Sequence, residues 1–363
     1  MPAPGQPAPV TPHAVVIRRS PMTDQQQHPA ETRQHDPDAA EKEPRSPWLR
    51  VVLIVAIAVT MCGLFGLSYS LALGRPTPKH VPTAIVHLTG GQPAAANQLQ
   101  ASTNGALELR PYPTEAAARK AIGDQQVYAA VIESPVGSQL WVSSATGASL
   151  SRVLQQAAQP LVTDPSVHLK IVDVHPLPKN DPQGLVSFYL TLAATIVGFI
   201  TMFQLRANVK ELTLPQWFGA VAFLAVVAGF VLAVIGDPVL GALRGRFFEV
   251  WLAFSVQSAI VALSASTLLV LVGRWAILPN WTIFILLGNT SSGGPVAPPL
   301  LPRLFSDLGH LLPTAATVTV IHDAAYFPGL VPWSAIVVNS TWLIGAAVAL
   351  YCFARLRHRT PAT

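Results

Sequence analysis

The chain has 363 residues, of which 51% are hydrophobic and 11% are charged, whereas about 25% of the residues in a soluble domain are charged. Its formal charge of +5 comes from basic residues at the ends of apolar runs, which argues against a nucleic-acid-binding patch and indicates membrane topology signals. Arginine, alanine and proline are abundant, as is typical of GC-rich genomes such as those of actinobacteria.

The amino-terminal segment is rich in proline, glutamine and charged residues and cannot bury enough apolar surface to fold. We therefore expect residues 1–47 to form a disordered cytoplasmic tail that is dispensable for membrane insertion. Residues 48–74 are expected to form the first transmembrane helix, since the run Val51–Leu73 is long enough to cross a hydrocarbon core of about 30 Å. Arg45 and Arg50 precede the apolar run of this uncleaved anchor, which predicts a cytoplasmic amino terminus.

From residue 75 to residue 184 the composition is that of a soluble domain. Strand-like runs alternate with helix-like stretches, which predicts an extracytoplasmic α/β domain. Thr114 is a plausible N-cap, and Gly123 a plausible helix stop. The expected strands are Thr83–Leu88, Leu107–Tyr112, Tyr128–Glu133, Gln139–Ser143 and Val167–Val174, and the expected helices are Thr114–Gly123 and Leu150–Leu161.

Apolar runs resume over residues 185–356 and predict a membrane bundle of five segments, the fourth of these being short and broken by Pro279. With the first helix, the fold class is an α-helical polytopic membrane protein with six transmembrane segments. The expected segments are Leu185–Leu205, Trp217–Ile235, Phe247–Val272, Trp275–Leu287 and Val331–Phe353.

Basic residues set the expected orientation of this bundle. Most fall where cytoplasmic loops are expected, so residues 357–363 should be a second cytoplasmic tail, with both termini inside the plasma membrane. Arg244 and Arg246 fall on the opposite side and conflict with this count. The residues that agree with it are Arg206, Lys210, Arg274, Arg355, Arg357 and Arg359.

Cysteine and nucleotide-binding chemistry are not indicated. Cys62 and Cys352 both lie inside apolar runs, so we expect small buried hydrophobic side chains. No phosphate-binding loop of the G-x-x-x-x-G-K-[ST] type occurs, so the chain is not expected to be an enzyme, and no cofactor is implied. Any ATP-driven work would need a separate ATPase subunit.

The most distinctive stretch is a polar turn rich in glycine, serine and proline between apolar arms. Such backbone is tolerated at membrane depth only where protein or water surrounds it, so residues 288–330 are expected to form a re-entrant or outer loop. Gly293 and Gly294 allow positive φ and close approach of the backbone, and the prolines fix an irregular path. The candidate functional residues of this loop are Gly288, Asn289, Ser291, Ser292, Gly293, Gly294, Pro299 and Pro302.

Two sets of polar residues in the bundle are further candidates. Gln257, Ser264 and Thr267 share one helix face, and with Asn339 they predict either hydrogen bonds between helices, which we favour, or a substrate path. Asp307, His310, His322 and Asp323 suggest a metal or acid–base site, but their spacing is not that of a ligand motif. We favour polar residues that satisfy helix ends for this second set.

The glycine-rich loop residues resemble the late loop of the YhgE/phage-infection-protein group of bacterial membrane proteins, a group similar to the permease domains of type-2 ABC exporters. Ala118–Ile132 resembles the helix–strand step of the external domain of these proteins, and the order of segments is similar over residues 50–356. The segment Arg206–Leu214 is shorter than the loop through which such permeases meet an ATPase, and the amino-terminal tail is not amphipathic.

The resemblance implies a membrane transport subunit, a homodimer in the lipid bilayer, that handles a hydrophobic or envelope-related compound. The alternative is a non-catalytic envelope scaffold or receptor-like protein that binds a partner through its external domain. A membrane-embedded enzyme using the Asp and His residues of the late loop is the least favoured hypothesis.

Overall fold

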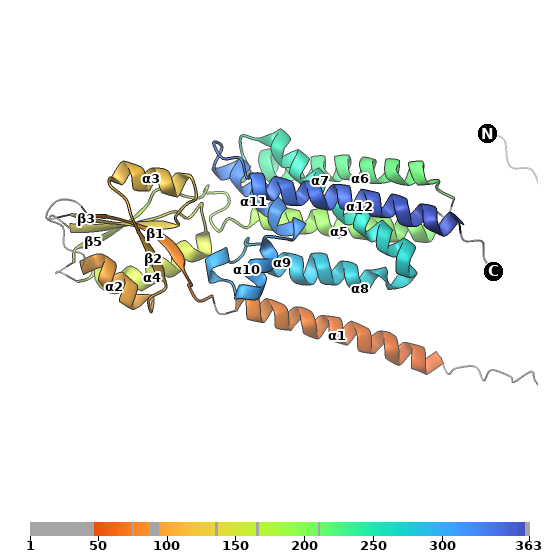
Figure 1. Cartoon of the computed structure of the whole chain (residues 1–363), viewed down its shortest axis with the longest axis horizontal. Helices are drawn as coiled ribbons and strands as arrows, with labels where there is room; N and C mark the ends of the chain where they lie inside the picture. Colours follow the sequence, from red (N-terminus) through yellow and green to blue (C-terminus); the bar gives the residue numbers. More distant parts are fainter. Residues whose placement is uncertain are drawn as a thin grey trace, which may run out of the picture. The chain divides into compact units, whose positions relative to one another are not determined.

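The computed structural model describes residues 47–74, 76–87, 94–134, 137–164, 167–209 and 211–359 (Figure 1). The chain divides into two units, residues 1–54 and 55–363, and every contact below lies within the second. The tail predicted over residues 1–47 falls outside the described residues except for Pro47, which begins helix α1 (Pro47–Leu73).

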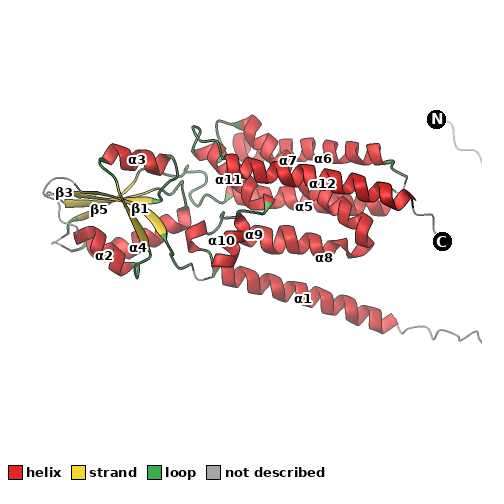
Figure 2. Cartoon of the chain, viewed as in Figure 1, coloured by secondary structure: helices red, strands yellow, loops and turns green. Residues whose placement is uncertain are grey.

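Among the described residues, five helices are long and apolar enough to cross a membrane, an architecture compatible with a polytopic membrane protein. The first is α1, and the others follow the α/β domain in the sequence, as the secondary structure in Figure 2 shows. They are α5 (Val186–Asn208), α6 (Leu214–Val234) continued by the π-helix η1 (Ile235–Val239), α7 (Phe247–Val272) with the short helices up to Thr290, and α12 (Trp333–Arg359).

The stretch from Phe247 to Thr290 is not one straight rod. Gly273 has φ +60° at the end of α7, and Phe284 packs in one cluster with Ile260. In a straight helix these two residues would be roughly 36 Å apart, so the chain turns back at Gly273. The returning arm is the separate short helix predicted over Trp275–Leu287, and the count of six spans stays a prediction. Its parts are η2 (Gly273–Ala276), α8 (Ile277–Asn280), η3 (Trp281–Leu287) and α9 (Gly288–Thr290).

Helices α10 (Arg303–Gly309) and α11 (Pro313–Tyr326) are bent by 71° relative to each other at the short break between them. Phe305 of α10 packs in the core of the α/β domain. At the other end of the segment, the Tyr326 hydroxyl of α11 donates a hydrogen bond to Asp181, which follows this domain in the sequence. Between them, Leu311 accepts a hydrogen bond from Trp342 of α12. The segment from α10 to α11 therefore starts and ends at the end of the bundle that faces the α/β domain, as a re-entrant segment does. This end is here called the domain end. The preceding loop contains one further turn, η4 (Pro298–Leu300).

Within the described part of the α/β domain, the sheet has five strands in the order β2-β1-β3-β4-β5, and only the β3–β4 pair is antiparallel. All five predicted strands are present, with ends shifted by a few residues. Helix α2 was not predicted, because its sequence AAANQLQAS buries only Ala95, Ala96 and Leu99 and has little apolar periodicity. The elements are β1 (Val81–His87), α2 (Ala94–Ser102), β2 (Leu107–Pro111), α3 (Glu115–Gly123), β3 (Ala129–Ser134), β4 (Gly137–Val142), α4 (Ala148–Val162) and β5 (Leu169–Asp173).

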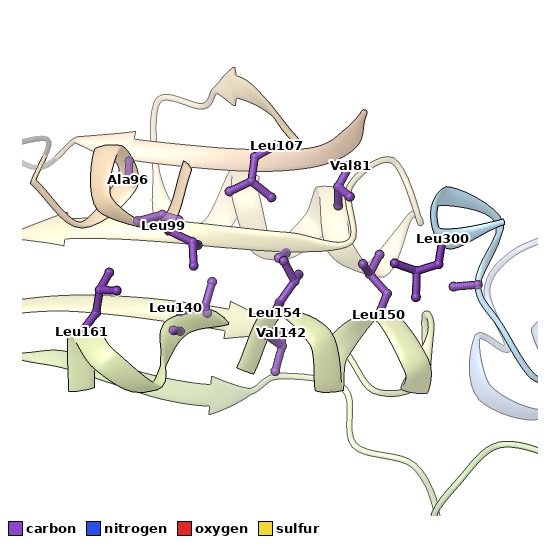
Figure 3. Packing of buried hydrophobic residues seen from close by; sticks show 14 of the residues in the cluster. Val81, Ala96, Leu99, Leu107, Leu140, Val142, Leu150, Leu154, Leu161 and Leu300 are labelled. Atoms are coloured by element: carbon purple, nitrogen blue, oxygen red, sulfur yellow. The ribbon is translucent and has the colours of Figure 1, made fainter. Parts of the chain in front are cut away.

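Apolar side chains cover both faces of this sheet. Helices α2 and α4 pack on one face, and α3 packs on the other through Ala118, Ala121 and Ile122. The predicted N-cap is confirmed, since the Thr114 hydroxyl accepts a hydrogen bond from the Ala117 amide at 3.1 Å. The core of the α2–α4 face also contains Leu300, which lies beside Leu150 in Figure 3 although the two are far apart in the sequence.

The prediction for the cysteines was wrong. Cys62 and Cys352 are both exposed, because each lies on a face of α1 or α12 that no other helix covers. An apolar run in a membrane helix marks burial in lipid as well as burial in protein, and the sequence pattern does not separate the two.

Candidate functional site

The glycine-rich loop joins the bundle to the α/β domain. Asn289, Ser291 and Ser292 are buried, and the segment from Val296 to Leu301 contributes to the domain core. Pro299 accepts a hydrogen bond from the Lys79 amide at 3.0 Å, and the Pro302 carbonyl accepts the first amide bonds of α10. The loop is therefore packed between two bodies rather than free as a linker.

Glycine is required in this loop for two different reasons. Gly293 has φ +75°, a left-handed conformation that other residues rarely adopt. A Cβ at Gly294 would lie 2.7 Å from Cβ of Phe188, and one at Gly288 would lie 2.8 Å from Oγ1 of Thr314. The expectation of positive φ and close approach thus holds, with each property at a separate glycine.

A cavity of about 120 Å³, here called the junction cavity, lies between this loop, the α/β domain and the domain end of the bundle. Its wall contains both polar and apolar side chains and includes Ser187 Oγ, a buried hydroxyl without a hydrogen-bond partner among the described residues. The lining residues used here are Gln125, Tyr128, Ser144, Thr146, Ser187, Ser292, Gly293, Gly294, Thr319, His322 and Asp323.

His322 and Asp323 tie α11 to the α/β domain. Gln125 Nε2 donates to Asp323 Oδ1 at 2.7 Å, and His322 Nε2 faces the Ala145 carbonyl oxygen at 2.5 Å. Nδ1 of His322 faces Asp323 Oδ1 at 3.2 Å. Both ring nitrogens therefore face oxygen atoms, and the pair links two parts of the molecule far apart in the sequence.

The other half of the titratable set lies elsewhere. Asp307 is exposed and 3.8 Å from Arg303, and His310 is also exposed. Within the described ranges, no three His, Cys, Asp or Glu side chains lie close enough to hold a metal ion. The four residues singled out by the sequence thus do not form one constellation, because two of them face outward from α10 and the turn that follows it.

Burial of Tyr128 in the wall of the junction cavity raises the pKa of its phenol to about 12. The cause is desolvation, which disfavours the phenolate. The side chain therefore lines the cavity as a neutral phenol.

A buried polar cluster lies in the middle of the bundle around Gln257. This side chain is 0% exposed and bonds to Thr195 of α5 and Thr317 of α11, and Asn339 of α12 bonds to Thr317 in turn. The predicted hydrogen bonding between helices is therefore present at Gln257 and Asn339. The threonine partners were missed, because nothing in the sequence tells which face of a neighbouring helix meets Gln257.

Farther along the predicted polar face of α7, Thr267 bonds to backbone carbonyls of α7 and α12. The Thr267 hydroxyl donates to the Leu263 carbonyl within its own helix at 2.9 Å and lies 3.4 Å from the Ala346 carbonyl. Ser264 is half-buried and lines a separate, mostly apolar pocket with Thr267 and Trp342. These two residues serve packing between α7 and α12.

A groove of about 430 Å³, here called the lateral groove, lies between α7, α11 and α12. Its walls are apolar, and polar residues occur only at its two ends. Arg246 and Glu249 stand at the domain end, and Asn339 and Ser340 stand at the inner end. The apolar lining is Leu252, Ala253, Val256, Val320, Ala324, Leu330, Val331 and Ile336.

Arg246, one of the two arginines that conflict with the predicted topology, forms an ion pair at the domain end of the lateral groove. Arg246 is paired with Glu249 and also donates to the Pro328 carbonyl. Its positive charge is thus compensated within the protein, which weakens it as a topology signal. Arg206, Arg274 and Arg355 belong to the other end of the bundle, at the ends of α5, α7 and α12.

In comparisons with protein-family models, curated proteins and solved structures, nothing matches this chain.

Proposed function

We propose that the chain is a membrane transport subunit, resembling the permease of a type-2 ABC exporter, that handles a hydrophobic or envelope-related compound in the plasma membrane. The observation that carries this proposal is the lateral groove. Its walls are apolar, and Leu252 and Val331 on them are more than half exposed. A compound dissolved in the bilayer could enter it sideways without crossing water.

The buried polar cluster around Gln257 adjoins the lateral groove. This supports a groove that binds a compound and does not merely contact bilayer lipid. Asn339 belongs both to the groove lining and to the cluster of Gln257. Polar side chains inside a membrane bundle face its interior and hydrogen-bond between helices, so a change at the groove can reach α5 and α11 through these bonds.

The energy source is proposed to be a separate ATPase. Helices α5, α6, α7 and α12 have charged residues only near their ends, so no carboxylate in the middle of these four spans offers a proton-coupling site. The proposal also includes a homodimer with both termini cytoplasmic.

The test is ATP hydrolysis by the complex isolated with the full chain in native lipid particles. Filling the groove with Val256→Trp should reduce the hydrolysis rate and the amount of bound amphiphile. The matched control, Val227→Trp, places the same side chain on the exposed face of α6, outside the groove, and should change neither. A complex without ATPase activity, or equal activity in both variants, would contradict the transport proposal.

The alternative, an envelope scaffold or receptor-like protein, is favoured by one feature of the α/β domain. Strand β5 is an edge strand, and an open depression lies beside it and α4, lined by Gln155, Val162 and Lys170 among others. An unpaired strand edge can accept a strand from a partner. A Lys170→Pro substitution that abolishes the cellular role while hydrolysis persists would favour this alternative.

A further inference from the structure

The hydrogen bonds of the buried polar cluster have a fixed direction, which begins on α5. The Thr195 hydroxyl donates to the Thr191 carbonyl at 2.9 Å, and a carbonyl oxygen can only accept. A hydroxyl has a single hydrogen, so Thr195 Oγ1 is left as an acceptor. The Gln257 group that faces it at 2.8 Å is the amide nitrogen, which donates to Thr195 Oγ1.

The same reasoning continues from α7 to α12. Because Gln257 turns its nitrogen toward Thr195, its oxygen faces Thr317 at 2.9 Å, and the Thr317 hydroxyl must donate. Thr317 can then only accept from Asn339, whose Nδ2 lies at 3.0 Å. The side-chain amide of Asn339 is thus oriented by a chain of donors and acceptors that starts on α5 and passes through α7 and α11.

The remaining group is the side-chain oxygen of Asn339. This Oδ1 is buried and has no hydrogen-bond partner among the described residues, and Asn339 as a whole is only 6% exposed. Asn339 lines the lateral groove. A buried acceptor without a partner is costly, so a group that donates to it is favoured at this place.

We infer that the lateral groove is the binding site of an amphiphile whose apolar chain carries a hydrogen-bond donor, a hydroxyl or an amide N–H, that reaches Oδ1 of Asn339. The polar headgroup of this amphiphile lies at the rim beside Arg246 and Glu249. Asn339 is six residues beyond the start of α12, so the donor lies about 9 Å deeper than the end of that helix. This inference deepens the proposed function by naming the class of compound.

The experiment compares a hydroxylated long-chain fatty acid with its unsubstituted parent of the same length. Each competes for the full chain in lipid nanodiscs against a photoreactive fatty acid. The wild type should bind the hydroxylated acid about three- to tenfold more tightly, the range expected from one net hydrogen bond. Val256→Trp, which fills the groove, should reduce binding of both acids.

Variants of the cluster separate the donor requirement from mere occupancy. Asn339→Leu should abolish the preference while binding of the unsubstituted acid persists. Thr317→Val, which frees the Asn339 amide to rotate, should weaken the preference, and Thr317→Ser, which keeps the hydroxyl, should retain it. The thermal stability of each variant is measured in parallel. Should Asn339→Leu fail to fold, Thr317→Val against Thr317→Ser tests the donor requirement, and an equal preference in these two variants would overturn it.

Equal binding of both acids to the wild type, with Val256→Trp blocking both, would overturn the donor inference and leave the proposed function standing. Binding that is insensitive to Val256→Trp would place the acids in the surrounding bilayer and would overturn both.

Discussion

At the scale of single residues, the late loop depends on glycines that have distinct tasks. Gly293 is held at φ +75°, and Gly294 lies against Phe188 at the start of α5. A side chain at the first position strains the backbone, and one at the second collides with a buried ring. The loop therefore tolerates neither change, for reasons that separate experiments can distinguish.

Gly294→Ala should lower the stability of the protein by about 1–3 kcal/mol, because the new Cβ would overpack against Phe188. Gly293→Ala should cost about 1 kcal/mol through its left-handed backbone. Thermal unfolding of the full chain in detergent measures both. The control is Gly329→Ala, a loop position with nothing within 4 Å of a new Cβ, which should be nearly neutral. Wild-type stability of Gly294→Ala would show that the loop is a free linker.

Tyr128 gives a pH-dependent prediction at the same scale. Its folded-state pKa is about 12, above the ordinary value of 10.0, so the folded state keeps a proton that the unfolded state loses between these values. Its contribution to stability is complete below pH 10 and is lost as the pH rises toward 12. The full chain should therefore lose more stability over this interval than Tyr128→Phe does. Parallel losses in the two proteins would mean that Tyr128 is solvated.

At the scale of elements, α11 connects the three sites. Thr317 lies in the polar cluster, Val320 lines the lateral groove, and His322 and Asp323 reach the α/β domain. A change in the groove and a change in the domain therefore act on one helix of fourteen residues.

The contact between Gln125 and Asp323 should couple the domain to α11. We expect a coupling free energy of about 1 kcal/mol in a double-mutant cycle of Gln125→Ala and Asp323→Ala, measured by thermal unfolding. Lys120→Ala with Asp124→Ala, an exposed ion pair within one helix, is the comparison and should give a smaller value. Additive effects of Gln125→Ala and Asp323→Ala would indicate that this contact does not hold the domain.

The helices and strands were largely predictable from the sequence, whereas the contacts between them were not. Apolar runs and period-two alternation located the long helices and all five strands, and Thr114 marked the start of α3. Helix α2 lacked such a pattern. The sequence also singled out Gln257, Asn339 and the glycines, since polar groups and irregular backbone in a membrane require protein partners. It could not show that Thr317 and Thr195 are those partners, because contacts between helices depend on rotation and crossing.

At the scale of the whole molecule, the proposed orientation makes a simple prediction. If the arginines at the ends of α5, α7 and α12 face the cytoplasm, the α/β domain lies outside. A phosphatase fusion after Ser144 should be active, and one at the carboxy terminus inactive. The reverse pattern would show that the topology is inverted and would remove the basis for a cytoplasmic ATPase.

The central claim is that the lateral groove, and not the general lipid-facing surface, holds the compound on which the protein acts. The most direct measurement places a photoreactive amino acid at Val256 in the groove or at Val227 on α6 and identifies the lipids that are crosslinked in cell membranes. We predict a defined amphiphile at Val256, in saturable amount, and ordinary bilayer lipids without saturation at Val227. The same unsaturable mixture of lipids at both positions would contradict the account.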